Sequence, residues 1–416
     1  MGGKNTQVIV TESPLLSGAI QKVSGIDSMA TYGHLFDYKY QSGKLHLTAK
    51  NPALIERIGF LNRPNTQIIV ATDNDAQGEL IAQHLIALTP KAKHSRIHIN
   101  EVTKSGIASA LKKPIAVNEL LANEAAYLRL LNLKLSHIEP RGTLTTTSLT
   151  LAKSFASRGR LNHLQNYEIN HHDQHYKTRL PKCVEGDVQF KLPPPANTRQ
   201  LAMLAAYNNI QSVHHELQEL YQNGRLSYIR TDSTTLPLTN SLYPHHVSSN
   251  QLTDSHYAIH NLTPYQTDFE RYVYKINESS VKGNTHCMDV VSPIGTFIAV
   301  NEPIGNDVLS AKSELMMHLS LDRDAFVSTI GRASERYEKV FFKAGKLNSN
   351  RVDEIIKQGH RYVPEIIDNG IKASIAIAAP SLNEQNIEQK NRIEFLAKTK
   401  GTSIEISTGD ELGILM

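Results

Sequence analysis

The sequence contains no tryptophan, only two cysteines and few aromatic residues, which make up 6% of the chain. The shortage of aromatic residues gives no sign of an extended platform for stacking nucleic-acid bases. Cys183 and Cys287 lie far apart in the sequence, which excludes a four-cysteine zinc ribbon and a disulfide framework. No run of roughly 18 apolar residues is present, and Met1 to Thr6 lacks the charged-then-apolar order of a signal peptide. We therefore expect a cytoplasmic protein with no membrane partner.

Strong charge of either sign is also missing. The chain carries 44 Lys and Arg against 40 Asp and Glu, a formal net charge of +4, and its pI is about 8.8. This balance permits nucleic-acid binding without arguing for it, so any such function must be inferred from particular residues. At 416 residues with 40% hydrophobic content, the chain is long enough for about two to four domains.

The N-terminal part of the sequence alternates between apolar, β-branched runs and amphipathic stretches, which is typical of an α/β domain with a largely parallel sheet. We expect strands over residues 6–10, 67–72 and 96–100, each followed by a helix, over residues 15–23, 78–88 and 104–111. In such sheets the functional groups collect at the carboxyl ends of the strands. Glu12 and the pair Asp73 and Asp75 occupy such ends.

The remaining sequence is more mixed. Leucine and alanine spacing predicts helices over residues 115–151 and 198–223, and the short apolar run at 188–192 predicts a strand. Strand-like stretches follow at residues 281–300, and then helices to about residue 358.

Asp73 and Asp75 stand one residue apart at the end of the second expected strand. Carboxylates so spaced direct oxygen atoms into one loop, where a cation such as Mg²⁺ is held by few protein ligands and keeps several waters. Glu12 is placed to supply a third carboxylate or to carry a proton. The same pattern before a helix is often only an N-cap whose charge suits the helix dipole, and the motif alone leaves both interpretations open.

Tyr228 and Arg230 form a second pattern, after a turn at Gly224. In an extended segment, residues two apart project to the same side, so the phenol and the guanidinium would face one substrate. A phenol can attack phosphorus while an arginine neutralises the non-bridging oxygens. Such a pair is more often simple packing beside a solvated charge, and this motif by itself does not decide the function.

Several motifs occur together and in order. They are Val8 to Pro14, Tyr32 to Leu35, Thr72 to Glu79, Arg96 with Glu101 to Lys104, Pro193 to Leu201, Leu220 to Ser233, and Ser255 to Ile259. The first four resemble the Toprim domain, and the last three resemble the active-site tyrosine region of type IA DNA topoisomerases. The matches extend over roughly residues 7 to 264.

This resemblance implies a strand-cleavage reaction with a role for each catalytic residue. Tyr228 would be the nucleophile, bonding to the 5′ phosphate and freeing a 3′ hydroxyl. Arg230 would stabilise the pentavalent phosphorus, and His256 would hydrogen-bond a phosphate oxygen. Glu12 would manage the proton on the 3′ oxygen. We therefore expect folding to gather the phenol, Arg230 and the acidic edge of the sheet around one phosphate.

The resemblance also implies the cofactor and the partners. Asp73 and Asp75, with Glu12, would hold Mg²⁺ for religation. The substrate would be single-stranded segments of negatively supercoiled DNA, which would be relaxed. Further DNA contacts would come from His34, Arg129, Thr231, Asp232 and Ser233. No ATP is expected, because transesterification conserves the phosphodiester energy and the sequence contains no G-x-x-x-x-G-K-[ST] phosphate loop. We expect a monomer.

The fold implied is an α/β Toprim domain followed by mostly helical and small β domains, arranged as in type IA topoisomerases. The expected divisions are a Toprim domain (1–115), a helical DNA-gripping domain (116–165 and about 305–360), a reduced β arch domain (166–197 and about 265–304), a tyrosine domain (198–264) and a C-terminal extension without an assigned role (361–416). The arch domains around the DNA hole of this family normally need more residues, so we expect an incomplete toroid.

The chain departs from the family pattern at several positions, among them Ala76, Gln222 and His260, and two further departures bear directly on catalysis. Gln77 replaces the third acid of Asp-x-Asp-x-Glu, and Glu79 would compensate only if the loop redirected it. Leu16 replaces a lysine that contacts the phosphate to be cut. These departures keep open an alternative, a catalytically degenerate homologue that binds single-stranded DNA as an accessory protein. A Toprim nuclease or primase would need no tyrosine signature, so Tyr228 argues against that class.

A histidine-rich cluster, formed by His163, His171, His172, Asp173 and His175, has the composition of a transition-metal site. Its polar context and the absence of partner cysteines favour a solvated or DNA-facing patch.

Overall fold

The structure is a computed structural model. It describes residues 6–41, 44–138, 144–158, 164–171, 173–181, 188–207, 213–237, 257–282, 286–292, 295–301, 333–344 and 346–360. The chain divides into two compact units, the first spanning Met1–Thr146 with Gly359–Met416 and the second spanning Thr147–Gln358. Within the described part of the chain, every helix is too short or too polar to span a lipid bilayer.

The first unit is built on a four-stranded sheet in the order β2-β1-β5-β6. These strands are β1 (Thr6–Thr11), β2 (Asp27–Ala30), β5 (Thr66–Val70) and β6 (Lys93–Arg96), and all neighbours are parallel. Val8 pairs with Ile68 and Val10 with Val70, and these four side chains are buried in one core cluster. The continuous apolar runs of β1 and β5 therefore reflect burial on both faces, because a parallel sheet is covered on each side.

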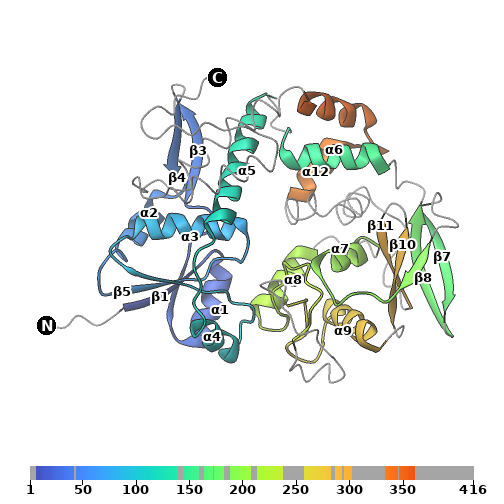
Figure 1. The fold of residues 1–416 in the computed structure, drawn as a ribbon, viewed down its shortest axis with the longest axis horizontal. Coiled ribbons are helices and arrows are strands. Elements are labelled where there is room, and N and C mark those ends of the chain that lie inside the picture. The colour runs from blue at the N-terminus through green and yellow to red at the C-terminus, as the bar shows by residue number, and fades with distance from the viewer. Residues whose placement is uncertain are drawn as a thin grey trace. The chain divides into compact units, whose positions relative to one another are not determined.

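Helices cover this sheet in Figure 1, with α2 (Pro52–Gly59) and α3 (Ala76–Leu88) on one side and α1 (Pro14–Ser24) and α4 (Lys104–Leu111) on the other. Each helix begins at a residue whose side-chain oxygen accepts a backbone N–H of the first turn. These N-caps are Ser13, Asn51, Asp75 and Thr103. The caps satisfy amides that the helices cannot pair internally, so the sequence fixes where each helix begins.

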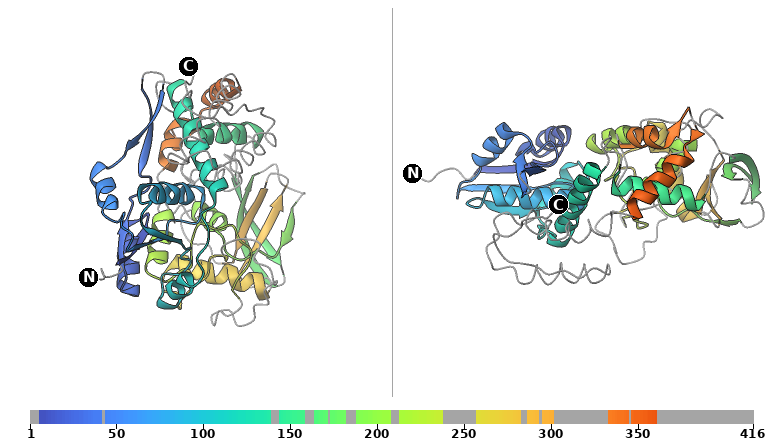
Figure 2. Two further views of the ribbon diagram at one scale, coloured as in Figure 1. Left: turned by 60° about the vertical axis from the view of Figure 1, so that its left-hand side comes forward. Right: turned by 90° about the horizontal axis from the view of Figure 1, so that it is seen from above.

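A β-hairpin and a long helix complete the first unit. Strands β3 (Phe36–Gln41) and β4 (Lys44–Ala49) pair antiparallel, and α5 (Glu119–Ile138) packs against α3. The hairpin lies beside α5 in Figures 1 and 2. Arg129 of α5 donates to the carbonyl oxygen of Phe36 at 3.1 Å.

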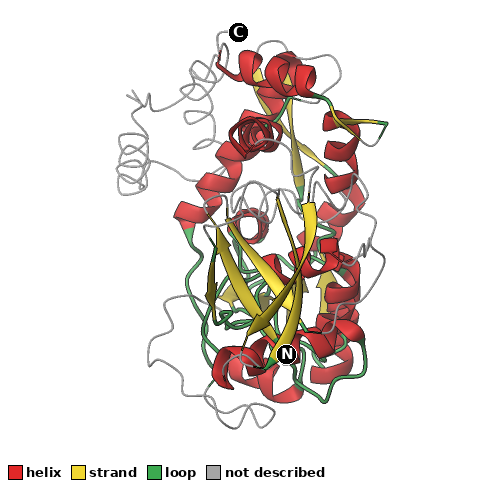
Figure 3. Ribbon diagram, turned by 90° about the vertical axis from the view of Figure 1, so that its right-hand side faces the viewer, coloured by secondary structure: helices red, strands yellow, loops and turns green. Residues whose placement is uncertain are grey.

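The second unit contains a five-stranded antiparallel sheet in the order β7-β8-β11-β10-β9, shown among the yellow strands of Figure 3. Its strands are β7 (Leu164–His171), β8 (Gln174–Pro181), β9 (Gln189–Lys191), β10 (Cys287–Ser292) and β11 (Gly295–Val300). The helices are α6 (Thr146–Arg158), α7 (Thr198–Tyr207), α8 (Val213–Gln222), α9 (Asp268–Lys282), α12 (Ala333–Phe341) and one over residues 349–360, and a small hairpin is formed by β12 (Phe342–Lys343) and β13 (Lys346–Leu347).

The sequence-based expectations hold for most elements of the α/β unit, but the strand expected over residues 96–100 is wrong. The strand is β6, and Arg96 is its last residue instead of its first. Ile97 and Ile99 are buried in the loop that follows, so their apolar pattern signals burial and not strand pairing. The β3–β4 and β7–β8 hairpins are not anticipated. The observed architecture is an α/β unit followed by helices and a small antiparallel sheet, as the fold class predicts.

Candidate functional site

The structure brings Glu12 and Asp73 together at one edge of the parallel sheet. Strands β1 and β5 are neighbours, with Val10 opposite Val70, so the residues after each strand meet at the same carboxyl edge. There the Oε1 atom of Glu12 accepts the backbone N–H of Asp73 at 3.0 Å. Two acidic residues that are 61 positions apart in sequence are thereby joined by a hydrogen bond. Glu12 and the segment 72–78 together are called the acidic loop below.

Asp75 is the N-cap of α3, as one of the two open interpretations predicts. Its Oδ1 atom accepts the backbone N–H of Gly78 at 2.8 Å, and its backbone is extended. Gly78 packs so closely that an added Cβ would overlap the carbonyl oxygen of Asp73. Thr72 closes the turn by donating its hydroxyl to the Gly78 carbonyl at 2.8 Å. A cap occupies one carboxylate oxygen, so the capping role and a metal role for Asp75 are compatible.

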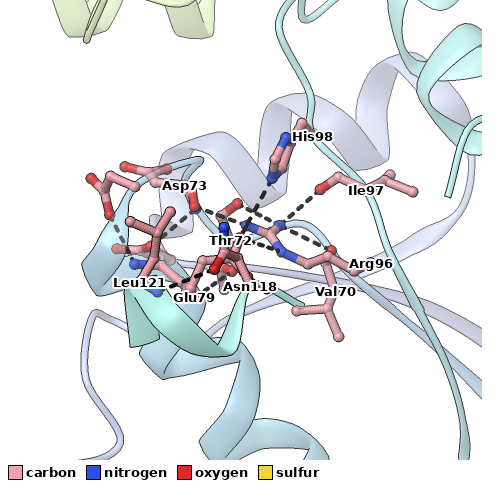
Figure 4. A network of polar contacts seen from close by, with 12 residues as sticks. Val70, Thr72, Asp73, Glu79, Arg96, Ile97, His98, Asn118 and Leu121 are labelled. Atoms are coloured by element: carbon pink, nitrogen blue, oxygen red, sulfur yellow. Dashed lines mark hydrogen bonds and ion pairs between the residues drawn. The ribbon is translucent and has the colours of Figure 1, made fainter. Parts of the chain in front are cut away.

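A buried arginine holds the acidic loop from beneath. The guanidinium of Arg96 donates to the carbonyl oxygens of Val70 at 3.3 Å, Thr72 at 2.8 Å, Asp73 at 2.9 Å and Ile97 at 2.8 Å (Figure 4). It also forms an ion pair with Glu79 at 2.8 Å, and the two side chains are only 1% and 2% exposed. Because a guanidinium presents several donors in one plane, a single side chain fixes the backbone that carries Asp73.

Glu79 therefore does not compensate for the missing third acid. Besides Arg96, its carboxylate accepts the backbone N–H of Asn118 at 2.8 Å and lies 3.5 Å from Nε2 of His98 (Figure 4). Burial alone would raise the pKa of Glu79, but the nearby His98 side chain, the Arg96 charge and the Asn118 N–H together lower it. Its side chain is directed into the fold as the anionic partner of Arg96.

Gln77, at the position of the missing acid, contacts His34. The Nε2 atom of His34 lies 2.8 Å from Oε1 of Gln77. Burial, reinforced by the positive charge of Arg129, lowers the pKa of His34 to about 3. The ring is therefore neutral at physiological pH and donates from Nε2 to the amide oxygen. A neutral amide and a neutral imidazole stand here in place of an acid, so the loop carries one negative charge fewer.

Arg129, expected to contact DNA, lies against the β3–β4 hairpin. Its guanidinium donates to the Phe36 carbonyl, lies 3.5 Å from the Asp37 carboxylate and stacks over the Tyr38 ring at 5.0 Å. Its side chain is 24% exposed. Leu16, at the position of the family lysine, is 3% exposed and belongs to the core.

The oxygen donors of the acidic loop suit a hard cation. Carboxylates of Glu12, Asp73 and Asp75 are the chemical class that Mg²⁺ prefers, and Mg²⁺ commonly takes one or two protein carboxylates and keeps its waters. Among the described residues, no set of three or more His, Cys, Asp and Glu side chains converges as a metal cage. The residues fit a sparsely coordinated magnesium ion better than a dedicated metal centre.

Tyr228 lies in the second unit, on a segment held by main-chain bonds. Leu226 forms a bridge with Asn261, and the Ser227 N–H donates to the His260 carbonyl at 3.0 Å. The Tyr228 side chain is buried, with 5% exposure, and packs edge-on against Tyr221 at 5.5 Å between ring centroids. Its hydroxyl oxygen is also buried. The tyrosine that the sequence analysis expects to attack DNA is therefore a buried residue in the structure.

The residues after Tyr228 differ in exposure. Arg230 is half-buried and Asp232 is exposed, whereas Thr231 and Ser233 are buried. The Thr231 N–H donates to the Thr198 hydroxyl at 2.9 Å, and the Ser233 N–H donates to the Thr231 hydroxyl at 3.0 Å. Thr231 and Ser233 thus shape this loop, and Arg230 and Asp232 are its more accessible members. His256 lies outside the described residues, so its expected phosphate contact stays a prediction.

Glu270 is a supporting residue of the tyrosine segment that the sequence analysis does not identify. Its carboxylate is fully buried and pairs with Nε of Arg225 at 2.5 Å. Its other oxygen accepts the N–H groups of Gln266 and Thr267 at 2.9 and 2.8 Å. Burial alone would raise the pKa of Glu270, but these bonds, led by the one from Arg225, lower it. The signal was present in the sequence, because Thr267-x-x-Glu270 is a capping box at the start of α9.

The histidine-rich cluster shows no metal site in its described members. Asp173 is at the tip of the β7–β8 hairpin with a positive φ of 60°, and His175 is exposed and bonds Asn170 at 2.8 Å. His163 and His172 lie outside the described residues.

Parts of the chain are similar to known proteins. Residues 7–102 match the Toprim domain family. DNA topoisomerase 1 of Campylobacter jejuni is 29% identical over 140 residues, which cover 30% of this chain and 20% of that protein. DNA topoisomerase 1 of Archaeoglobus fulgidus is 25% identical over 224 residues, covering 42% of this chain and 33% of that protein. The chain thus matches a third or less of the length of these relatives.

A solved structure has a similar fold. The structure of full-length topoisomerase I from Thermotoga maritima aligns with a TM-score of 0.55 over 96% of this chain and 90% of that one, at 14% sequence identity. At this identity the likeness shows the fold alone, and it extends well beyond the Toprim region.

Proposed function

We propose that this chain is a type IA DNA topoisomerase that cuts and reseals one DNA strand through Tyr228. The Toprim match over residues 7–102, the partial similarity to DNA topoisomerases 1 and the fold shared with a topoisomerase I support the proposal. The observation that carries the proposal is the convergence of Glu12 and Asp73 at the carboxyl edge of the sheet. That edge provides the acidic loop which the chemistry needs, and Tyr228 with Arg230 provides the nucleophile and the counter-charge.

In the proposed cleavage step, the phenol oxygen of Tyr228 attacks a backbone phosphorus while the bond from phosphorus to the 3′ oxygen breaks. Arg230 neutralises the charge that builds on the non-bridging oxygens. The phenol proton passes to solvent, the protonated Glu12 carboxyl gives its proton to the departing 3′ oxygen, and the strand end stays on Tyr228 as a 5′-phosphotyrosyl ester. In religation the 3′ hydroxyl attacks that ester and regenerates the phenol. One phosphodiester is exchanged for another, so the stored energy of negative supercoils drives relaxation without ATP.

Magnesium would be held by Asp73 and Asp75, with Glu12 beside them, and would supply positive charge next to the phosphate. Arg96 and Glu79 serve this site indirectly, because they fix the backbone from which Asp73 projects. The substrate would be single-stranded DNA in underwound duplex.

The test is a covalent trapping assay with the full chain. The protein is incubated with single-stranded oligonucleotides labelled at the 3′ end over a range of Mg²⁺ and Mn²⁺, denatured, and examined for a labelled protein band. We expect a band that disappears in Tyr228→Phe. Tyr221→Phe is the matched control, because its ring packs against that of Tyr228 and the band should persist. A band retained in Tyr228→Phe, or absent under every condition, would overturn the cleavage proposal.

A second candidate function is single-strand binding without cleavage. Two observations favour it: Leu16 is a core residue where the family has a phosphate-contacting lysine, and Gln77 is bonded to His34 where the family has an acid. Oligonucleotide binding without a covalent band would select this candidate.

A further inference from the structure

An aromatic side chain projects into solvent beside the acidic loop. Tyr32 is the second residue after β2 and is 60% exposed. Its backbone N–H donates to the carbonyl oxygen of Glu12 at 2.9 Å. Because Thr11 of β1 pairs with Ala30 of β2, these two chain ends leave the sheet side by side. Tyr32 therefore belongs to the same carboxyl edge as Glu12 and Asp73.

The backbone of Tyr32 is strained. Its φ is 58°, a left-handed conformation that favours glycine and is unusual for an aromatic residue. Two main-chain bonds hold it there, from Thr31 N–H to the Thr11 carbonyl at 2.8 Å and from Tyr32 to Glu12. A bulky residue at such a position destabilises the fold, and strained residues of this kind concentrate at functional sites. An exposed ring gains little from packing, so stability does not explain its presence.

The surroundings of Tyr32 suit a nucleobase. Leu15, in the first turn of α1 just after Glu12, is 67% exposed and adds a second apolar side chain at this edge. The aromatic ring and the acidic loop are complementary to the two parts of a nucleotide. Bases stack on aromatic faces, and the phosphate of the backbone binds by charge, here through a metal held by the carboxylates.

We propose that Tyr32 is a stacking residue for a base of the single strand whose phosphate lies at the acidic loop. This inference rests on the proposed function for its ligand, single-stranded DNA. Stacking on one ring is tolerant of sequence because every base has a π face. Tyr32 would position the strand, and it would take no part in bond making or breaking.

The experiment measures binding of a fluorescent single-stranded oligonucleotide to the full chain in a Tyr228→Phe background, so that cleavage does not contribute. We expect Tyr32→Ala to weaken binding by roughly fivefold or more, and Tyr32→Phe to bind as the parent does, because the ring is what matters. Phe60→Ala is the matched control. Phe60 is also 60% exposed in the same unit, but it leads into the amino end of β5, away from the acidic loop.

An abasic scan identifies the base concerned. At one position in the oligonucleotide, removal of the base should weaken binding to the parent and leave binding to Tyr32→Ala unchanged. A stability measurement adds an independent readout: Tyr32→Gly should raise the urea midpoint while it weakens binding, because glycine relieves the positive φ. If the Tyr32 ring served only to stabilise the fold, Tyr32→Gly would lower the urea midpoint.

The two proposals fail in different ways. Equal binding by Tyr32→Ala and the parent, within about twofold, overturns the stacking role and leaves covalent trapping by Tyr228 untouched. Loss of binding in Tyr32→Ala, in a protein that never forms the covalent band, supports the stacking role and overturns the cleavage proposal. A parent that binds no single-stranded DNA overturns both.

Discussion

Removing the charge of Glu79 tests whether the Arg96 network stabilises the acidic loop. Glu79→Gln keeps the side-chain volume and leaves the buried guanidinium without its anionic partner. Breaking a buried ion pair from one side costs about 3–5 kcal/mol, because the remaining charge stays desolvated. Both side chains are at most 2% exposed, so solvent screening offers little relief. We expect a loss in this range in the free energy of unfolding of the first unit.

A double-mutant cycle separates the pair from the rest of the network. Arg96→Met should also destabilise the unit, since it removes the bonds to the carbonyls of Thr72 and Asp73. The double variant should lose less than the sum of the two single variants, by about 0.5–3 kcal/mol, because the Glu79–Arg96 interaction is counted twice in that sum. Strict additivity would mean that the two residues stabilise the loop independently.

The assay is urea unfolding at neutral pH, with hydrogen exchange of peptides covering β5 and α3 to report the first unit separately. A pH series tests the direction in which the stability contribution of Glu79 changes with pH. The pKa of Glu79 is lowered from 4.5, so its ionised form stabilises the fold above that value, and the contribution disappears as pH falls through the folded-state pKa. Glu79→Gln should therefore flatten the acid side of the stability profile. A change below about 0.5 kcal/mol, within the range of ordinary surface substitutions, would refute the reasoning.

Three further predictions follow from the site. Glu270→Gln should destabilise the second unit most above pH 5, because the lowered pKa of Glu270 means that its charge stabilises the fold at higher pH. Urea unfolding at several pH values measures this effect, and Glu219→Gln is the exposed control. Gln77→Glu restores the third acid and should tighten Mg²⁺ binding several-fold, measured by calorimetry; unchanged affinity would show that the third acid contributes nothing here. Asp75→Asn should keep the N-cap and α3 stability within about 0.5 kcal/mol but weaken Mg²⁺ binding, and Asp75→Ala should lose about 1 kcal/mol more. An unfolding midpoint that drops equally in both variants would argue against the capping role.

The α/β unit was predictable because its strands are buried on both faces. Continuous apolar runs such as Ile68 to Ala71, separated by capped helices, leave few alternatives to a parallel sheet. The placement of Glu12 and Asp73 at one edge then follows from topology. Strand β6 was misplaced because Lys93 to Arg96 is polar, and no local pattern shows that Arg96 is buried by pairing with Glu79, 17 residues away.

The β7–β8 hairpin was not predicted for a different reason. Strands β7 and β8 carry exposed polar residues such as Glu168 and Lys177, which face each other across the ladder. Only one face of an antiparallel sheet needs to be apolar, so the sequence of β7 and β8 has the polar composition of a connecting loop. The burial of Tyr228 was equally hidden, because exposure depends on neighbours such as Tyr221 that sequence spacing does not reveal.

The tight contact of Gly78 with the Asp73 carbonyl has a consequence for how this loop can diversify. Position 78 admits no side chain, because a Cβ there would overlap the Asp73 carbonyl. The bonds of residue 73 with Glu12 and Arg96 are made by its backbone, and loss of the cap at position 75 costs only about 1 kcal/mol. A saturation library across residues 73–78 should therefore return the fewest folded variants at position 78.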